Sequence, residues 1–406
     1  MNIIHKADKM LNIRSDIRGP IFAEAERMRA QGIDVLRLNT GNLAPFGFTA
    51  PESVRKALTE NLDTTVGYCD SRGLLSARQA IVDYHTKRGA VNVDVNRVFI
   101  GNGVSELVNM AMTALLNPGD EVLIPAPDYP LWTNCVRLGG GTPVHYICDE
   151  QSDWYPDLDD IRSKINANTK AIVIINPNNP TGALYSRDLL EQLVQIAREN
   201  DLIIFSDEIY DRLIIDDEAE FTSTASLAPD LLVVTMNGLS KSHVICGFRC
   251  GWMVLSGPDG IADEYMAGLF QLAAMRLCSN VPAQVVIPAA LSDPESTRAM
   301  LRPGGRVYDQ REATTRALEK IPGLSFVKNK ATFYVFPKLD VKRFNITDDE
   351  QFCIDFLHEK HIMLVNGHGF NWMKPDHFRI VMLPEADKLT WAMEELGDFL
   401  STYKQK

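Results

Sequence analysis

A lysine in a loop of small residues is the side chain in this sequence best suited to covalent chemistry. Lys241 follows the segment Asn-Gly-Leu-Ser at 237–240, and Arg249 comes later in the same loop. A neutral amine forms an imine with a carbonyl compound, and a nearby cation favours the neutral form of the amine. The segment predicts an imine-forming site, while a solvated loop lysine is the alternative that Lys241 by itself leaves open.

An aspartate follows a second apolar run. Asp207 lies in Leu-Ile-Ile-Phe-Ser-Asp-Glu-Ile-Tyr at 202–210, just beyond a predicted strand. Open α/β sheets bind ligands at the carboxyl ends of their strands. A carboxylate there can pair with a protonated ring nitrogen and make an aromatic ring a better electron sink. Asp207 as the cap of the next helix is the alternative.

Two turns add polar groups to the same predicted edge of the sheet. The segment Ile-Ile-Asn-Pro-Asn-Asn-Pro-Thr-Gly at 174–182 places Asn179 near Asp207. An amide at this place can donate to an oxygen atom on the same aromatic ring, beside Tyr210. The segment Ile-Gly-Asn-Gly-Val-Ser-Glu-Leu at 100–107 joins a strand to a helix through glycines. Free N–H groups at a helix start attract phosphate, although a short Gly-x-Gly is a weak signal.

The elements that position these residues follow an α/β pattern. Between about residues 96 and 256, short apolar runs alternate with segments of helical periodicity, which is typical of a mainly parallel sheet flanked by helices. The predicted helices include residues 105–116, 130–138 and 186–200. The seven predicted strands are residues 98–100, 121–124, 144–147, 171–175, 202–205, 231–235 and 251–255.

The last hundred residues or so mix helices and strands, which predicts a smaller α+β domain. Helices are expected at 308–320 and 386–403, and strands at 333–336, 362–365 and 378–382. The stretch Arg-Pro-Gly-Gly-Arg at 302–306 marks the join. We predict an N-terminal arm and part of the small domain in 1–45, a large cofactor-binding domain in 46–300 and a small domain in 301–406.

Composition excludes several classes of protein. A chain of 406 residues with 45% hydrophobic residues can bury a large core. The net charge of -12, without a long basic run, argues against nucleic-acid binding. Apolar runs are too short for a membrane span, so we expect a cytoplasmic protein. The seven cysteines and eight histidines show no disulfide framework and no metal-ligand spacing, so we predict no metal.

In their chain order, these motifs resemble those of the fold-type I pyridoxal-5′-phosphate (PLP) enzymes of the class I/II aminotransferase group. The resemblance runs from about Leu38 to Arg379. It is specific because the Asn-Pro-x-Asn-Pro-Thr-Gly turn, a later Asp-Glu-x-Tyr and a Ser-Lys…Gly-x-Arg occur together. The sequence is most similar to the bacterial glutamate–pyruvate (alanine) aminotransferases, through segments 39–48, 67–73, 125–132 and 375–380.

The resemblance implies an enzyme that moves an amino group between an L-amino acid and a 2-oxo acid. Lys241 would bind PLP as a Schiff base and shuttle a proton, Asp207 would hold the ring nitrogen, and Arg379 would bind the substrate α-carboxylate. The enzyme would be a homodimer, with Tyr68 reaching the phosphate of the neighbouring subunit. Trp132 is expected only to pack behind Tyr129. The other implied contacts are Asn179 and Tyr210 at the ring hydroxyl, Tyr129 on the ring face, Val104, Ser105, Ser240 and Arg249 at the phosphate, and Gly41 in the substrate pocket.

Three departures from the alanine aminotransferase pattern put the substrate in question. His243 and Val244 stand where those enzymes have Tyr-Arg, Ala331-Thr332 replaces a Gly-Ala pair, and Gly367-His368-Gly369 adds a histidine. The loss of the arginine predicts that glutamate is a poorer donor here. His243 and His368 are either hydrogen-bond donors to substrate or packing residues.

Two alternative functions stay open at this point. Another PLP reaction on the same fold, such as elimination or oxidation, begins with the same deprotonation at Cα. A regulatory protein that keeps the fold as a sensor would need a DNA-binding module, which the sequence does not contain.

Overall fold

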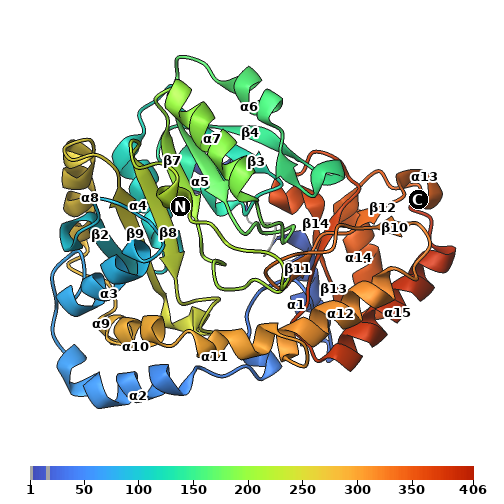
Figure 1. Ribbon diagram of the computed structural model, residues 1–406. Helices are drawn as coiled ribbons and strands as arrows, with labels where there is room; N and C mark the ends of the chain where they lie inside the picture. Colours follow the sequence, from blue (N-terminus) through green and yellow to red (C-terminus); the bar gives the residue numbers. More distant parts are fainter. Residues whose placement is uncertain (1–2, 15–18) are drawn as a thin grey trace.

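A large central sheet organises most of the chain. The computed structural model describes residues 3–14 and 19–406. Its main sheet has eight strands in the order β2-β9-β8-β7-β6-β3-β4-β5 (Figure 1). The strands are β2 (Val98–Asn102), β3 (Glu121–Ala126), β4 (Thr142–Asp149), β5 (Tyr155–Pro156), β6 (Thr169–Ile175), β7 (Ile203–Asp207), β8 (Val233–Gly238) and β9 (Cys250–Ser256). All seven predicted strands belong to this one sheet, and β5 adds a two-residue edge strand.

The sheet is mainly parallel, as predicted. Strand β3 pairs in parallel with β4 and β6, and β7 pairs in parallel with β6 and β8. Strand β9 is antiparallel to β2 and β8, and β5 is antiparallel to β4. The parallel strands therefore end at one edge, where β6 finishes at Ile175 and β7 at Asp207.

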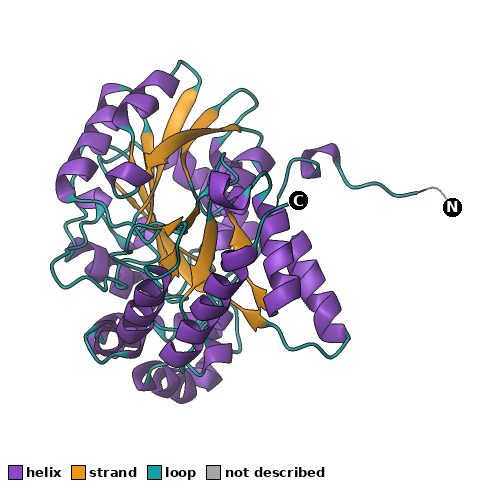
Figure 2. Ribbon diagram, turned by 90° about the vertical axis from the view of Figure 1, so that its right-hand side faces the viewer, coloured by secondary structure: helices purple, strands orange, loops and turns teal. Residues whose placement is uncertain are grey.

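Helices cover both faces of this sheet, as Figure 2 shows. Val122 and Ile124 of β3 pack against α4 (Val104–Leu115), α5 (Leu131–Leu138) and α8 (Asp263–Met275). Leu123, between them in sequence, packs on the opposite face with α7 (Arg187–Glu199). Alternate side chains of a strand point to opposite faces, so a strand buried on both faces needs a continuous apolar run. This explains why the strands were visible in the sequence.

A third group of helices packs at the β2–β9 end of the sheet. Val54, Ile81 and Ile287 are completely buried there with Val98 and Ile100 of β2. The helices concerned are α2 (Glu52–Asn61), α3 (Leu75–Thr86), α9 (Val281–Gln284) and α10 (Ile287–Ser292). Helix α6 (Leu158–Lys164) contacts β4, and α11 (Glu295–Arg298) leads toward the C-terminal part.

The C-terminal elements form a separate core together with the start of the chain (Figure 1). Strand β1 pairs in parallel with β13, and Ile21, Ala25 and Met28 of α1 are buried among C-terminal side chains. The elements are α1 (Pro20–Ala30), β1 (Leu36–Arg37), α12 (Arg306–Leu318), β10 (Leu324–Ser325), β11 (Tyr334–Val335), β12 (Lys338–Leu339), α13 (Val341–Phe344), α14 (Asp349–Lys360), β13 (Ile362–Met363), β14 (Val365–Asn366), β15 (Phe378–Val381) and α15 (Ala386–Thr402). The domain boundaries at 45/46 and 300/301 stay a prediction.

One predicted strand of this region is two strands. The segment 362–365 divides at Leu364, because β13 pairs with β1 while β14 pairs antiparallel with β15. Strand β15 is also antiparallel to β11.

The described segment before α1, residues 3–14, extends away from the body (Figure 2). Its described part contacts α5, where Arg137 donates to the carbonyl oxygen of Asn12 at 2.7 Å. Within residues 3–14 and 19–406, no helix is long and apolar enough to cross a membrane.

Candidate active site

The ends of the parallel strands enclose a cavity of about 190 Å³. Ile175 and Asp207, which end β6 and β7, lie in its wall with the first residues of α4. Apart from Tyr68, all predicted site residues line this cavity: Gly41, Val104, Ser105, Tyr129, Asn179, Asp207, Tyr210, Ser240, Lys241, Arg249 and Arg379. The fold therefore brings together side chains from nearly the whole length of the chain.

The amine of Lys241 points at the segment between β1 and α2. Its Nζ donates to the carbonyl oxygen of Gly41 at 2.9 Å. A side chain at Gly41 would collide with the hydroxyl of Tyr334 and the ring of Phe333. A glycine is needed here so that the backbone can approach the lysine and the aromatic pair at once.

Asp207 is a buried carboxylate at the end of β7. Its Oδ2 accepts a hydrogen bond from Trp132 Nε1 at 3.0 Å, and Oδ1 accepts from the backbone N–H of Ile209 at 3.3 Å. Burial raises the pKa of Asp207, and the indole hydrogen bond opposes that rise. Among the described residues no cation pairs with Asp207. A protonated ring nitrogen would supply the missing positive charge.

Trp132 was underrated by the sequence interpretation, which assigned it to packing. The indole is completely buried in α5, and its N–H reaches the carboxylate. The signal was its position three residues after Tyr129, which sets both side chains at one end of the sheet. The contact itself joins residues on two separate elements and could not be read from either segment.

The start of α4 and Arg249 form an anion-binding corner. Side chains at Gly103 or Gly251 would collide with the Arg249 guanidinium and the first turn of α4, respectively, so the two glycines allow this close approach. Arg249 donates to the Cys246 carbonyl at 2.8 Å, and no carboxylate pairs with it in the described part of the chain. A cation beside a helix N-terminus is suited to phosphate.

Arg379 of β15 is a buried guanidinium clamped between two aromatic rings. Its central carbon is 4.5 Å from the ring centroids of both Tyr334 and Phe370. Its Nη1 donates to Asn179 Oδ1 at 2.8 Å, and Nη2 donates to the carbonyl of Asn39. Its Nε is buried and has no hydrogen-bond partner among the described residues. Burial lowers the pKa of Arg379.

These contacts leave Arg379 without a negative partner. No carboxylate lies within ion-pair distance of it anywhere in residues 3–14 and 19–406, and its exposed fraction is 2%. A buried charge without a partner is unfavourable, and a planar guanidinium binds a carboxylate with two parallel hydrogen bonds. The geometry is therefore that of a receptor for a carboxylate.

Tyr210 and Tyr334 contribute two hydroxyl groups to the same wall, with their oxygen atoms 3.0 Å apart. Tyr334 was not predicted as a site residue. Its position in the predicted strand 333–336, just after the Ala331-Thr332 departure, was the available signal.

Tyr68 is the predicted site residue that lies away from the cavity. Its side chain is 81% exposed, and Val66 beside it is 91% exposed. Within a single chain it does not line the cavity.

The two histidines among the departures do not face the cavity. His243 is buried, with Nδ1 2.8 Å from Ser242 Oγ and Nε2 2.9 Å from the carbonyl oxygen of Ala290. Burial lowers the pKa of His243 to about 4. His368 contacts Asp349 through Nδ1 at 2.7 Å. His243 is therefore a packing residue, whereas the His368 side chain is 40% exposed beside Asp349, and neither histidine lines the cavity of the single chain.

Val244 and Thr332 have an unusual backbone. Both have positive φ, of 62° and 65°, although β-branched residues rarely adopt it. Val244 packs against the apolar cluster that contains Leu43, Tyr210 and Phe333. The position of the expected arginine is therefore apolar in this chain.

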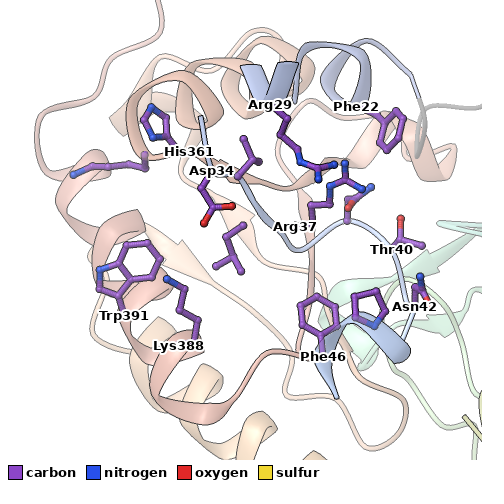
Figure 3. Close-up of a pocket in the computed structure, with 15 residues that line it drawn as sticks. Phe22, Arg29, Asp34, Arg37, Thr40, Asn42, Phe46, His361, Lys388 and Trp391 are labelled. Carbon is purple, nitrogen blue, oxygen red and sulfur yellow. The ribbon is translucent and has the colours of Figure 1, made fainter. Parts of the chain in front are cut away.

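A larger hollow of about 720 Å³ lies next to the cavity and shares Thr40 with it (Figure 3). Arg29 and Arg37 line it from the N-terminal side, and Lys388 and Trp391 line it from α15. It contains none of the predicted site residues. The smaller cavity is the candidate active site because it holds the lysine, the buried carboxylate and the unpaired guanidinium.

Known sequences establish the class of this protein. The sequence model of the family "Aminotransferase class I and II" matches residues 33–396, so the chain belongs to that family. The enzyme is a PLP-dependent aminotransferase that transfers amino groups between amino acids and 2-oxo acids. The predicted family, fold class and cofactor are confirmed.

Individual relatives cover essentially the whole chain. The glutamate-pyruvate aminotransferase AlaA of Escherichia coli is 54% identical over 405 residues, covering 100% of both chains. An alanine aminotransferase of Mycobacterium tuberculosis is 48% identical over 398 residues, covering 98% of this chain and 92% of its own. Among solved structures, an aminotransferase from Escherichia coli has a TM-score of 0.98 at 54% identity and covers 100% of both chains. An alanine aminotransferase from Pyrococcus furiosus has a TM-score of 0.93 at 37% identity, covering 98% of this chain and 100% of its own.

The cavity suits PLP in its charges. Among residues 3–14 and 19–406, no cation pairs with the buried carboxylate of Asp207 and no carboxylate pairs with Arg249 beside the α4 N-terminus. Lys241 lines the same cavity. These three groups match the ring nitrogen, the phosphate and the aldehyde of the cofactor.

Proposed function

We propose that this aminotransferase is of the alanine type and exchanges the amino group between L-alanine and a 2-oxo acid. The observation that carries the proposal is Arg379, a buried guanidinium that has no carboxylate partner in the described part of the chain and lies in the same cavity as Lys241. The names of the relatives at 54% and 48% identity support the alanine–pyruvate pair. The alternatives of elimination and oxidation have no such support.

The roles of the residues follow from their chemistry and position. Lys241 would hold the cofactor covalently, and its amine would move the proton at the substrate Cα. Arg379 binds and orients the α-carboxylate, which brings Cα toward Lys241. When bound, PLP supplies an electron sink for the negative charge that develops at Cα. Asp207 holds the ring nitrogen in its protonated form, and Trp132 fixes the direction of that carboxylate.

The remaining cavity residues hold the cofactor. Arg249 would bind the phosphate together with Val104 and Ser105, the first residues of α4, and with Ser240, which lines the same cavity. Asn179 gives its Oδ1 to Arg379, which leaves its amide N–H groups free to donate to the ring oxygen beside Tyr210. Tyr129 covers the ring face, and Gly41 leaves room for the substrate.

A homodimer with shared sites is part of the proposal. Tyr68 completes the phosphate site of the partner subunit. Support comes from the exposed apolar side chains beside it, because Leu62, Val66 and Leu75 are 54%, 91% and 61% exposed. Exposed apolar surface of this kind is typical of a protein interface. A cytoplasmic location agrees with the seven cysteines, all of which are free thiols.

A variant specificity, with glutamate as a weak donor, is the second candidate. In the described chain, the cations that line the cavity are Lys241, Arg249 and Arg379, and each has a role above. The apolar cluster around Val244 offers no charge for a second carboxylate. An amino donor with a neutral side chain, such as alanine, is then a better substrate than glutamate.

A screen of amino donors against pyruvate and 2-oxoglutarate tests both candidates. We expect L-alanine to convert 2-oxoglutarate to glutamate with release of pyruvate. Release of ammonia without a new amino acid would show elimination instead. Efficient glutamate–pyruvate exchange that does not change in Val244→Arg would rule out the variant specificity and leave the ordinary alanine type.

A further inference from the structure

Of the two hydroxyl groups in the cavity wall, that of Tyr334 has no role in the function proposed above. Tyr334 and Tyr210 both line the cavity, and their side chains are 2% and 3% exposed. Their oxygen atoms are 3.0 Å apart. In the part of the chain that the structure describes, neither hydroxyl has another hydrogen-bond partner. One of them must therefore donate to the other.

Three contacts hold the Tyr334 hydroxyl in this position. The ring lies 4.5 Å from the central carbon of the Arg379 guanidinium. Phe333 meets it edge-on, with the ring centroids 4.8 Å apart. Gly41 leaves the space that the hydroxyl occupies, since any side chain there would collide with it. The hydroxyl cannot turn toward solvent without displacing its neighbours.

The direction of the hydrogen bond follows from what Tyr210 does. A phenol has a single hydrogen to donate and can accept through its lone pairs. Burial, reinforced by Tyr334, raises the pKa of Tyr210 well above its ordinary value, so Tyr210 keeps its hydrogen at neutral pH. When Tyr210 donates that hydrogen to the ring oxygen of the cofactor, the pair requires Tyr334 to be the donor to Tyr210.

We propose that Tyr334 is a positioning residue, whose hydroxyl donates to Tyr210 and directs the Tyr210 hydrogen at the ring oxygen of the cofactor. Hydrogen bonds in such a chain polarise one another, which makes Tyr210 a stronger donor. A stronger donor disperses the negative charge on the ring oxygen, so the lysine-bound cofactor holds its proton less tightly. Tyr334 thereby lowers the pH at which the bound cofactor changes protonation state. The inference rests on the proposed roles of Lys241 and Tyr210.

The absorbance of the cofactor-loaded enzyme as a function of pH provides the test. Tyr334→Phe removes the hydroxyl and keeps the ring beside Arg379. We expect the midpoint of the titration to rise by about half a pH unit. Expressed as free energy, this shift is a fraction of what one neutral hydrogen bond contributes. Tyr210→Phe should raise it further, and the double variant should match Tyr210→Phe because Tyr334 acts through Tyr210.

Tyr146→Phe is the matched control. It removes another buried tyrosine hydroxyl, which donates to the Val173 carbonyl at 2.8 Å outside the cavity, and should leave the midpoint unchanged. If Tyr210→Phe shifts the midpoint and Tyr334→Phe does not, or if the two shifts add in the double variant, the inference is overturned and the role of Tyr210 stands. If Tyr210→Phe itself has no effect, the role of Tyr210 and the inference both fail.

Discussion

Replacement of Arg379 by alanine is the most direct perturbation of substrate binding. The guanidinium is held by Asn179 and Asn39, and its Nε has no partner within the described chain, so a substrate carboxylate would be bound by charge-assisted hydrogen bonds in a buried site. Each such bond contributes roughly 1.5–3 kcal/mol. Two bonds, partly replaced by water that enters the space left by the side chain, amount to about 3–4 kcal/mol. That corresponds to a fall in kcat/KM of about 100- to 1,000-fold.

The assay compares alanine with ethylamine, which has the same amine but no carboxylate. Arg379→Ala should lower kcat/KM steeply for alanine and for its 2-oxo acid acceptor, and should leave the slow reaction with ethylamine nearly unchanged. Arg187→Ala, at an arginine that is 62% exposed on α7, is the control for loss of a positive charge. An equal loss with alanine and ethylamine would refute the reasoning, because the arginine would then act on something other than the carboxylate.

Three further perturbations address the cofactor, the dimer and the pH dependence of stability. Lys241→Ala should abolish turnover and the borohydride-reducible link to PLP, and a reducible link that persists in this variant contradicts the assignment. Asp207→Asn should keep cofactor binding but slow the proton transfer that single-turnover absorbance measures. Tyr68→Phe should weaken cofactor affinity about 10- to 100-fold, as expected for one hydrogen bond to a charged group, and sedimentation should give a dimer; a fully active monomer argues against shared sites. His243 has a folded-state pKa of about 4, below the unfolded value of about 6.5. As the pH falls between these two values, the unfolded state binds the proton first, so the free energy of unfolding falls by at most about 1.4 kcal/mol per pH unit. His243→Asn should reduce that slope in denaturant unfolding, whereas a pH-independent difference from the wild type would show that the histidine is not neutral when buried.

Much of the fold was predictable because the sheet is buried on both faces. Strands such as β6 are continuous apolar runs, and the chemical groups follow at their ends, so Asp207 and Asn179 could be placed at one edge from the sequence. The two-residue strand β5 gives no periodicity and was missed. The break at Leu364 was missed because only the pairing partners, β1 and β15, distinguish β13 from β14.

The candidate site was predictable where a residue stands in a motif and not where its role depends on a distant contact. Trp132 contacts a carboxylate 75 positions away, and Tyr334 contacts a hydroxyl 124 positions away. The side chain of His243 is turned away from the cavity by the carbonyl of Ala290, 47 positions later. No local pattern contains these pairings, because they arise only when the elements pack.

The short parallel pairing of β1 with β13 fixes the stretch that begins at β1 to the C-terminal elements, and the same stretch contacts both Arg379 and Lys241. Leu36 and Leu38 donate to the carbonyls of His361 and Met363, and Val381 of β15 donates back to Leu38. Within the next three residues the same stretch accepts from Arg379 at Asn39 and from Lys241 at Gly41. The segment therefore links the C-terminal elements to Arg379 and to Lys241 through its backbone hydrogen bonds. A rotation of the C-terminal elements would displace Asn39 and Gly41 together, so the carboxylate receptor cannot move without moving the acceptor of the lysine amine.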